Sequence, residues 1–280
     1  MTGLAGLSQR VARLTEIRAI MTAMKNLSLV ETRKLARFIG HQQRMLSNIV
    51  AATGDFLQFF PDQGGGDTSA AILVLIGSER GFCGNFNERL ITALGAVTSW
   101  RQVPSLLLVG HRLGLKLDNH PRVLARLEGA TVTEDVPAVL DQLMDALHSA
   151  RGQLVARSVA LSCLSVEADG DACFKRLLPI APDPAPSAPH LPYPPRLNAT
   201  PAAFFAGLLD QYLLAELHGC LYGSLAAENR QRLAHMEHAL DRLDQKVARL
   251  ALRRNALRQE KIVEEIEVML SSAMALGTHI

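Results

Sequence analysis

The chain lacks the features that mark several common classes of protein. Its 29 lysines and arginines nearly balance its 27 aspartates and glutamates, so the composition does not favour a nucleic-acid partner, which needs a concentrated basic face. No apolar run reaches the roughly 18 residues that a membrane-spanning helix requires. The N-terminal sequence MTGLAGLSQR has neither the apolar core of a secretory signal nor an arginine- and serine-rich leader, so we expect no cleaved targeting segment.

Cysteine is scarce as well. The four cysteines, Cys83, Cys163, Cys173 and Cys220, are scattered, with no CxxC pair and no histidine at metal-ligand spacing. We therefore expect buried thiols in a reducing compartment and no metal site. Cys163 and Cys173 could face each other across a predicted hairpin, so a redox pair is the alternative.

Glycine and proline are absent from Ser224 to Leu276, so nothing in this stretch breaks a helix. Its apolar residues step by threes and fours, as in the seam of a coiled coil: Met236, Leu240, Leu243, Val247, Leu250 and Leu257. At about 1.5 Å per residue, this helix would be roughly 80 Å long. A helix of that length must project from a globular domain and pack on another helix.

The N-terminal segment 1–60 shows a similar spacing, less regular toward its end. The first part of the stripe is Leu4, Leu7, Val11, Leu14, Ile17, Met21 and Met24. Gly40 predicts a kinked or two-part helix. The other faces are mostly basic, which fits either a solvated surface or an acidic partner.

The middle of the chain, residues 70–182, has a different period. AAILVLI (Ala70–Ile76) and SLLLVG (Ser105–Gly110) are short continuous apolar runs, typical of buried parallel strands. Helices are predicted at 87–100 and 136–153, and a strand hairpin at 154–166 and 173–180. The segment therefore predicts a compact Rossmann-like α/β domain.

These segments predict the fold class α+β/α/β, an antiparallel coiled coil of long N- and C-terminal helices with the α/β domain inserted between them. We expect the boundaries 1–60 for the N-terminal helix, 70–182 for the α/β domain, 183–207 for a proline-rich linker and 208–280 for the C-terminal helix. A repeat near 3.5 residues predicts left-handed supercoiling. The last segment, VMLSSAMALGTHI, extends past the regular N-terminal stripe, so its apolar residues need cover from the chain itself or from other subunits.

The loop GSERGFCGNFN (Gly77–Asn87) follows the first strand, where an α/β fold can bind a phosphate. It has neither the GKS/GKT ending of a P-loop nor the GxGxxG spacing of a dinucleotide site. We expect a tight turn with Phe82 and Cys83 packed inward, and no cofactor. No Ser/His/Asp set converges elsewhere, so we expect no catalytic residues.

Four segments of the chain resemble the gamma subunit of F-type ATP synthases, the central-stalk rotor. They are IRAIMTAMKNLS (Ile17–Ser28), ILVLIGSERGFCGNFN (Ile72–Asn87), LYGSLAAENRQRLAHMEHAL (Leu221–Leu240) and RRNALRQEKIVEEIEVML (Arg253–Leu270). The third is similar to the pattern Ala-Ser-Glu-x-x-x-Arg-Met, and the fourth to Tyr-Asn-x-x-Arg-Gln-x-x-Ile-Thr-x-Glu-Ile.

The chain departs from the family pattern at four positions. Glu79, Arg254 and Val263 stand where the family has Asp, Tyr and Thr, and Glu31 replaces a lysine usual near the first motif. These departures suggest a divergent bacterial branch. The cysteine-bearing segment of the thiol-regulated chloroplast type is absent.

The resemblance implies a shaft that turns inside a ring of alpha and beta subunits. By resemblance, Arg258 and Gln259 would contact a catch loop of one beta subunit, while Met24 and Lys25 would lie against an acidic lever segment of another. The globular domain would grip the epsilon subunit and the membrane c-ring. The resemblance further implies a non-catalytic subunit, a peripheral membrane protein on the cytoplasmic face of the cell inner membrane.

Two other functions fit parts of the sequence. A static adaptor, with a coiled-coil arm on an α/β head, explains every periodicity equally well. An α/β enzyme with a helical oligomerisation arm would need a nucleotide site that the loop at Gly77 does not supply.

Overall fold

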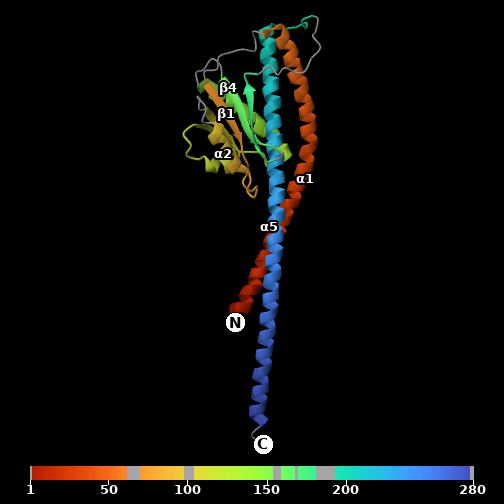
Figure 1. Cartoon of the computed structure of the whole chain (residues 1–280), viewed down its shortest axis with the longest axis vertical. Coiled ribbons are helices and arrows are strands. Elements are labelled where there is room, and N and C mark those ends of the chain that lie inside the picture. The colour runs from red at the N-terminus through yellow and green to blue at the C-terminus, as the bar shows by residue number, and fades with distance from the viewer. Residues whose placement is uncertain are drawn as a thin grey trace. The chain divides into compact units, whose positions relative to one another are not determined.

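A computed structural model describes residues 2–61, 70–97, 104–153, 159–167, 170–180 and 193–277 of the chain. The chain divides into two compact units: Ser28–Leu233, and Met1–Leu27 together with Ala234–Ile280. The α/β domain lies in the first of these units (Figure 1). Within the described ranges, no helix combines the length and the apolarity needed to cross a lipid bilayer.

Two long helices begin and end the chain. Helix α1 spans Thr2–Phe59 and helix α5 spans Pro201–Gly277. The prediction of a two-part N-terminal helix is wrong, because α1 continues through Gly40. A Cβ atom at Gly40 would have no neighbour within 4 Å, so close packing does not require glycine at this position. A single glycine costs a helix only about 1 kcal/mol relative to alanine, which is too little to interrupt a packed helix.

The C-terminal helix starts earlier than the sequence predicts. Residues 201–207 were expected in the extended linker 183–207, but α5 begins at Pro201. Proline is favoured at the first helical position because its missing N–H would have no helical partner there. The hydroxyl of Thr200 accepts a hydrogen bond from the Ala203 N–H at 3.3 Å, which caps this end. Residues 183–192 of the predicted linker lie outside the described ranges.

A five-stranded sheet forms the centre of the α/β domain. Its strands are β1 (Ala70–Ile76), β2 (Ser105–Val109), β3 (Val123–Leu127), β4 (Val159–Val166) and β5 (Ala172–Leu178), in the order β3-β2-β1-β4-β5. Only β5 is antiparallel to its neighbour. The two apolar runs and the hairpin are confirmed as strands, whereas β3 was not predicted. Its burial alternates along VLARL because it is an edge strand, so it lacks a continuous apolar run.

Helices cover both faces of this sheet. They are α2 (Phe86–Val97), α3 (His111–Lys116) and α4 (Val136–Gln153), with a 3-10 turn at Thr133–Asp135. One core joins α4 and α5 to the face that carries Ile72, Val74 and Cys163. The other core joins α2 and α3 to the face that carries Leu73 and Leu75. Figure 1 shows α5 running beside the sheet, with α1 next to it.

The side of α5 that meets the sheet is an apolar stretch. Leu217, Leu221, Tyr222 and Leu225 are all buried in the core with the sheet. Fully burying a leucine-sized side chain contributes about 1.5–3 kcal/mol, so this segment anchors α5 to the domain.

In the other unit, the ends of α1 and α5 run antiparallel. Arg18 Nε lies 2.5 Å from Asp244 Oδ1, and Lys25 Nζ lies 3.0 Å from Glu237 Oε1, so the numbering rises on one helix as it falls on the other. The half-buried positions repeat the predicted stripe: Leu4, Leu7, Val11, Leu14, Met21 and Met24 on α1, and Leu240, Leu243, Val247, Leu250 and Leu257 on α5. Ile17 departs from the stripe, since it is 46% exposed.

Beyond Leu257, every residue of α5 as far as Ser272 is exposed. This end carries a row of large apolar side chains, Ile262, Val263, Ile266, Val268, Met269 and Leu270. An apolar helix end of this kind marks a surface that another molecule covers.

A half-buried histidine lies next to an aromatic pair formed by α1 and α5 in the larger unit. The ring centroid of His218 lies 4.6 Å from that of Tyr222, and the ring of Tyr222 stacks on Phe38 of α1 with the centroids 5.6 Å apart. The Nε2 atom of His218 is buried and has no hydrogen-bond partner among the described residues. Burial lowers the pKa of His218. Below pH about 6.5 the unfolded chain therefore takes up a proton that the folded chain resists.

We accordingly expect the free energy of unfolding of the purified chain to be insensitive to His218 above pH about 6.5 and to fall as the pH drops below it. One proton limits this slope to about 1.4 kcal/mol per pH unit, and the partial exposure of the ring reduces it further. Urea unfolding between pH 7 and 5 tests this, with His218→Phe as the variant that keeps an aromatic ring. A variant whose pH profile equals that of the wild type would contradict the expectation.

Candidate functional site: the loop after β1 and the shaft residues

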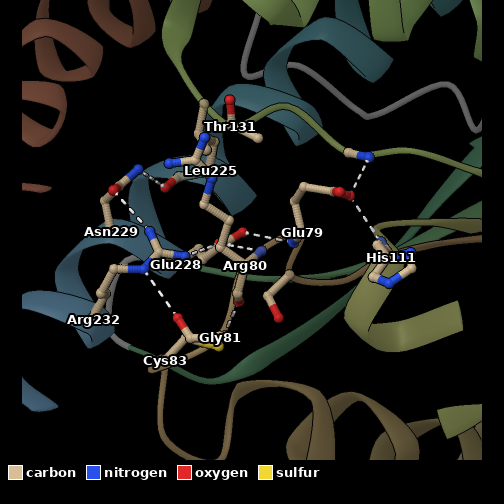
Figure 2. A network of polar contacts seen from close by, with 12 residues as sticks. Glu79, Arg80, Gly81, Cys83, His111, Thr131, Leu225, Glu228, Asn229 and Arg232 are labelled. Atoms are coloured by element: carbon tan, nitrogen blue, oxygen red, sulfur yellow. Dashed lines mark hydrogen bonds and ion pairs between the residues drawn. The ribbon is translucent and has the colours of Figure 1, made fainter. Parts of the chain in front are cut away.

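The loop after β1 (Gly77–Asn87) is hydrogen-bonded to the carboxylate of Glu228 on α5. The backbone N–H groups of Glu79 and Arg80 donate hydrogen bonds to the two oxygens of Glu228, each at 3.3 Å. Arg232, one helical turn further on, forms an ion pair with Glu228 and donates to the Gly81 carbonyl oxygen at 3.2 Å. Figure 2 shows these side chains converging on the loop. Glu228 and Arg232 are 4% and 5% exposed, so both charges are buried.

The carboxylate of Glu228 has hydrogen-bond and ion-pair partners, but its burial disfavours the charged form. Burial raises its pKa, while the charge of Arg232 and the two backbone donors oppose that rise. Asn229 completes the group, because its side-chain oxygen accepts a hydrogen bond from Arg232 at 3.0 Å. The pair therefore holds the loop to α5 through hydrogen bonds in which one partner carries a charge.

Glu79 ties the ends of two neighbouring strands together. Its Oε2 accepts hydrogen bonds from the His111 N–H at 2.8 Å and the Gly129 N–H at 2.6 Å, after β2 and β3 (Figure 2). The family pattern has an aspartate here, and glutamate keeps the carboxylate. The backbones of Gly77 and Gly110 also approach closely: a Cβ on Gly110 would lie 2.6 Å from the Gly77 oxygen, and its φ of 109° favours glycine.

The turn itself differs from the prediction at one residue. Cys83 is buried as expected, but Phe82 is 56% exposed and has a φ of 64°. The inward position of Phe82 was therefore a wrong prediction, because the left-handed backbone at this residue points its side chain away from the core. Ser78 and Asn87 brace the turn through hydrogen bonds of 3.0 and 2.8 Å.

Two backbone N–H groups at the start of the loop after β1 are already bound within the chain. In nucleotide-binding α/β folds, backbone N–H groups at this position bind the phosphate, whereas here those of Glu79 and Arg80 bind Glu228. A phosphate would also meet the negative charge of Glu228. Among the described residues, no group of three histidine, cysteine or acidic side chains could hold a metal ion.

We therefore expect the full-length chain alone to show no saturable ATP binding at micromolar concentrations by isothermal titration calorimetry. Gly84→Ala, at a residue with φ of 60°, and Gly40→Ala, on open helix surface, serve as the test and control variants. Saturable binding that Gly84→Ala abolishes and Gly40→Ala preserves would overturn this expectation.

Glu31, which replaces a family lysine, has a structural role. Its Oε2 accepts hydrogen bonds from the N–H and the hydroxyl of Thr133 at 3.0 and 2.8 Å, and its side chain is 5% exposed. It thus joins α1 to the start of α4. The charge is not part of the solvated face that the sequence pattern suggested.

The four predicted shaft residues differ in exposure. Met24 is half-buried on the stripe of α1, and Lys25 forms its ion pair with Glu237. Arg258 and Gln259 are exposed on α5, and neither has a hydrogen bond or ion pair with any described residue. Arg258 and Gln259 are therefore available to a partner, whereas Lys25 already has an acidic partner within the chain.

The sequence analysis does not identify Glu228 and Arg232 as functional residues. Both lie in the segment Leu221–Leu240, which resembles the family, but the resemblance implies no role for either residue. The available signal was a glutamate and an arginine four residues apart in an apolar helical segment, a spacing that places them on one face.

Comparison with known proteins gives a consistent result. The profile of the family described as ATP synthase matches residues 3–276. An "ATP synthase gamma chain" of Heliobacterium modesticaldum is 26% identical, covering 99% of this chain and 100% of the relative. The protein of the same name from Clostridium botulinum strain Langeland is 22% identical over 98% of both chains.

Solved structures share the fold. A chain in the rotor of the Euglena gracilis mitochondrial ATP synthase matches with a TM-score of 0.60 at 13% identity, covering 92% of this chain and 98% of that one. A chain in the central stalk and c-ring structure of the Tetrahymena thermophila enzyme matches with a TM-score of 0.53 at 16% identity, covering 79% and 99%.

The family profile extends over nearly the whole chain and includes both long helices and the sheet between them. The alignments with these two relatives cover 98% and 99% of this chain. The chain therefore belongs to the ATP synthase gamma chain family.

Proposed function

We propose that this chain is the rotating central shaft of a rotary, ion-translocating ATP synthase. As the gamma subunit, it would couple ion flow through the membrane sector to ATP synthesis or hydrolysis in the alpha and beta subunits. The observation that carries this proposal is the family match over residues 3–276. The chain itself would be non-catalytic, which fits the occupation of the loop after β1 by Glu228.

The proposed partners are the alpha, beta and epsilon subunits and the c-ring. The apolar end of α5, which is bare in the isolated chain, would lie among the alpha and beta subunits. The α/β domain would contact the epsilon subunit and the c-ring. Through them the chain would be a peripheral protein on the cytoplasmic face of the cell inner membrane.

We propose that α1 and α5 form a left-handed antiparallel coiled coil. The alternating three- and four-residue steps of the half-buried positions and the antiparallel ion pairs support this geometry. The proposed domains are an N-terminal helix at 1–60, an α/β domain at 70–182 and a C-terminal helix that begins at Pro201.

In the proposed mechanism, the shaft contacts the three equivalent beta subunits one after another, and each contact changes the relative free energies of that subunit's conformations. As the shaft rotates, each face of α1 and α5 would meet a different beta subunit and favour one of its conformations. Arg258 and Gln259 would bond a beta-subunit loop at one angle, and Met24 and Lys25 would contact an acidic segment at another. Lys25 would have to exchange Glu237 for that segment, which is feasible because exposed ion pairs are weak.

Two experiments test this function. Purification of the tagged full-length chain from native membranes should recover the alpha, beta and epsilon subunits. In that complex, a disulfide between Gln259→Cys and a cysteine introduced in a beta subunit should stop ATP hydrolysis, and dithiothreitol should restore it. Hydrolysis that continues with the disulfide closed would favour a static adaptor over a rotor.

A further inference from the structure

Three sulfur atoms and a lysine gather on the sheet face beneath α5. Cys163 of β4 lies opposite Lys175 of β5 in the antiparallel pair, so their side chains share one face. Cys173, two residues before Lys175, projects to the same face. Cys173 itself lies opposite Ser165, so the alternative in which Cys163 and Cys173 face each other across the hairpin is wrong.

Helix α5 brings the third cysteine to this face. Tyr212, Glu216 and Cys220 are four residues apart and therefore lie on one side of the helix. Glu216 is 4% exposed, and its Oε2 lies 2.6 Å from Lys175 Nζ, which fixes this side of α5 against β5. One turn further, Cys220 packs against the core that contains Cys163.

The two thiols of this contact are not equivalent. Interaction with Cys163 lowers the pKa of Cys220, and Lys175 adds to this, whereas interaction with Cys220 and complete burial raise the pKa of Cys163. Burial raises the pKa of Cys173 to about 11. Cys220 is also partly exposed, while Cys163 is 0% exposed. Of the pair Cys163 and Cys220, Cys220 is therefore the thiol that ionises first and that a small oxidant reaches first.

We propose that Cys220 and Cys163 are an oxidisable pair, in which a hydroperoxide converts Cys220 to a sulfenic acid and Cys163 then closes a disulfide between α5 and β4.

The chemistry balances with hydrogen peroxide as the oxidant. The Cys220 thiolate attacks one peroxide oxygen, so an S–O bond forms, the O–O bond breaks, and hydroxide leaves and takes up a proton to give water. The Cys163 thiol then loses its proton and attacks the Cys220 sulfur. The S–S bond forms, the S–O bond breaks, and a second water leaves. Two thiols are oxidised to one disulfide while one peroxide is reduced to two waters.

Closure would fasten α5 to the sheet covalently at the point where it is now held by packing and by the Lys175–Glu216 pair. It would constrain the unfolded chain over the segment from Cys163 to Cys220, which stabilises the folded state. All four cysteines are free in the structure, so the described state is the reduced one.

The test treats the full-length reduced chain with hydrogen peroxide, blocks the remaining thiols with N-ethylmaleimide, and identifies linked peptides by mass spectrometry without reduction. We expect a Cys163–Cys220 peptide within one chain, together with a higher urea midpoint that dithiothreitol reverses. Cys83, which belongs to the core on the opposite sheet face, supplies the control variant Cys83→Ser, and Cys173→Ser supplies a second; both should retain the linkage.

In Cys163→Ser the linkage should be absent, and Cys220 should accumulate as sulfinic acid because it has lost its resolving thiol. Cys163→Ala repeats the test in case the buried hydroxyl disturbs folding. A Cys173–Cys220 linkage in the wild type would overturn the assignment. Sulfinic acid on wild-type Cys220 without any linkage would overturn it too, as would peroxide reacting at Cys83 first.

Discussion

Replacing Glu228 by alanine is expected to lower the free energy of unfolding of the chain by about 3–5 kcal/mol. The substitution leaves Arg232 buried without a counter-charge, since both side chains are at most 6% exposed. It also removes the acceptor for the N–H groups of Glu79 and Arg80, so the loop after β1 loses its attachment to α5. Urea unfolding followed by circular dichroism measures the loss.

A double-mutant cycle separates the cost of leaving one charge buried without its partner from the cost of lost side-chain packing. Glu228→Ala with Arg232→Ala should be less damaging than the sum of the two single variants, because no unpaired charge then remains buried. Glu260→Ala, the same substitution at an exposed position of α5, should change stability little. Additive losses in the double variant would show that the pair does not act as a unit.

The second large effect concerns coupling. In the assembled complex, Arg258→Ala is expected to lower steady-state ATP hydrolysis about tenfold or more, because a charge-assisted hydrogen bond is worth about 1.5–3 kcal/mol and about 1.4 kcal/mol corresponds to a factor of ten. Arg258 is exposed on α5, and its side chain forms no hydrogen bond or ion pair with another described residue, so the isolated chain should fold normally. Hydrolysis by the reconstituted complex measures the effect.

Two controls accompany this experiment. Arg253→Ala removes the same side chain from another exposed face of α5 and should leave hydrolysis nearly unchanged. Deleting the residues after Leu276 should leave assembly and rotation largely intact, since the four residues removed include no lysine, arginine, aspartate or glutamate that could form a strong ion pair with a partner. Normal hydrolysis by Arg258→Ala would mean that the contact does not exist in this divergent chain.

Local patterns in the sequence were sufficient for much of the fold. Strands β1 and β2 are runs that are apolar at every position, and α4 was predicted at its observed bounds. The long helices follow from spacing and from the absence of proline. These features depend on residues within a few positions of one another, so periodicity reveals them. The family resemblance likewise depends on linear motifs, and it predicted the family that the comparisons show.

Only the tertiary structure decided which distant residues meet. Glu228 bonds a loop that is 149 residues away in the chain, and Glu31 bonds Thr133, 102 residues away. Charge patterning treats such carboxylates as solvated, because nothing local reveals that packing will bury them. Cys163 likewise lies opposite Lys175 rather than Cys173, in the core against which Cys220 packs, because strand register and the packing of α5 on the sheet arise from the whole domain.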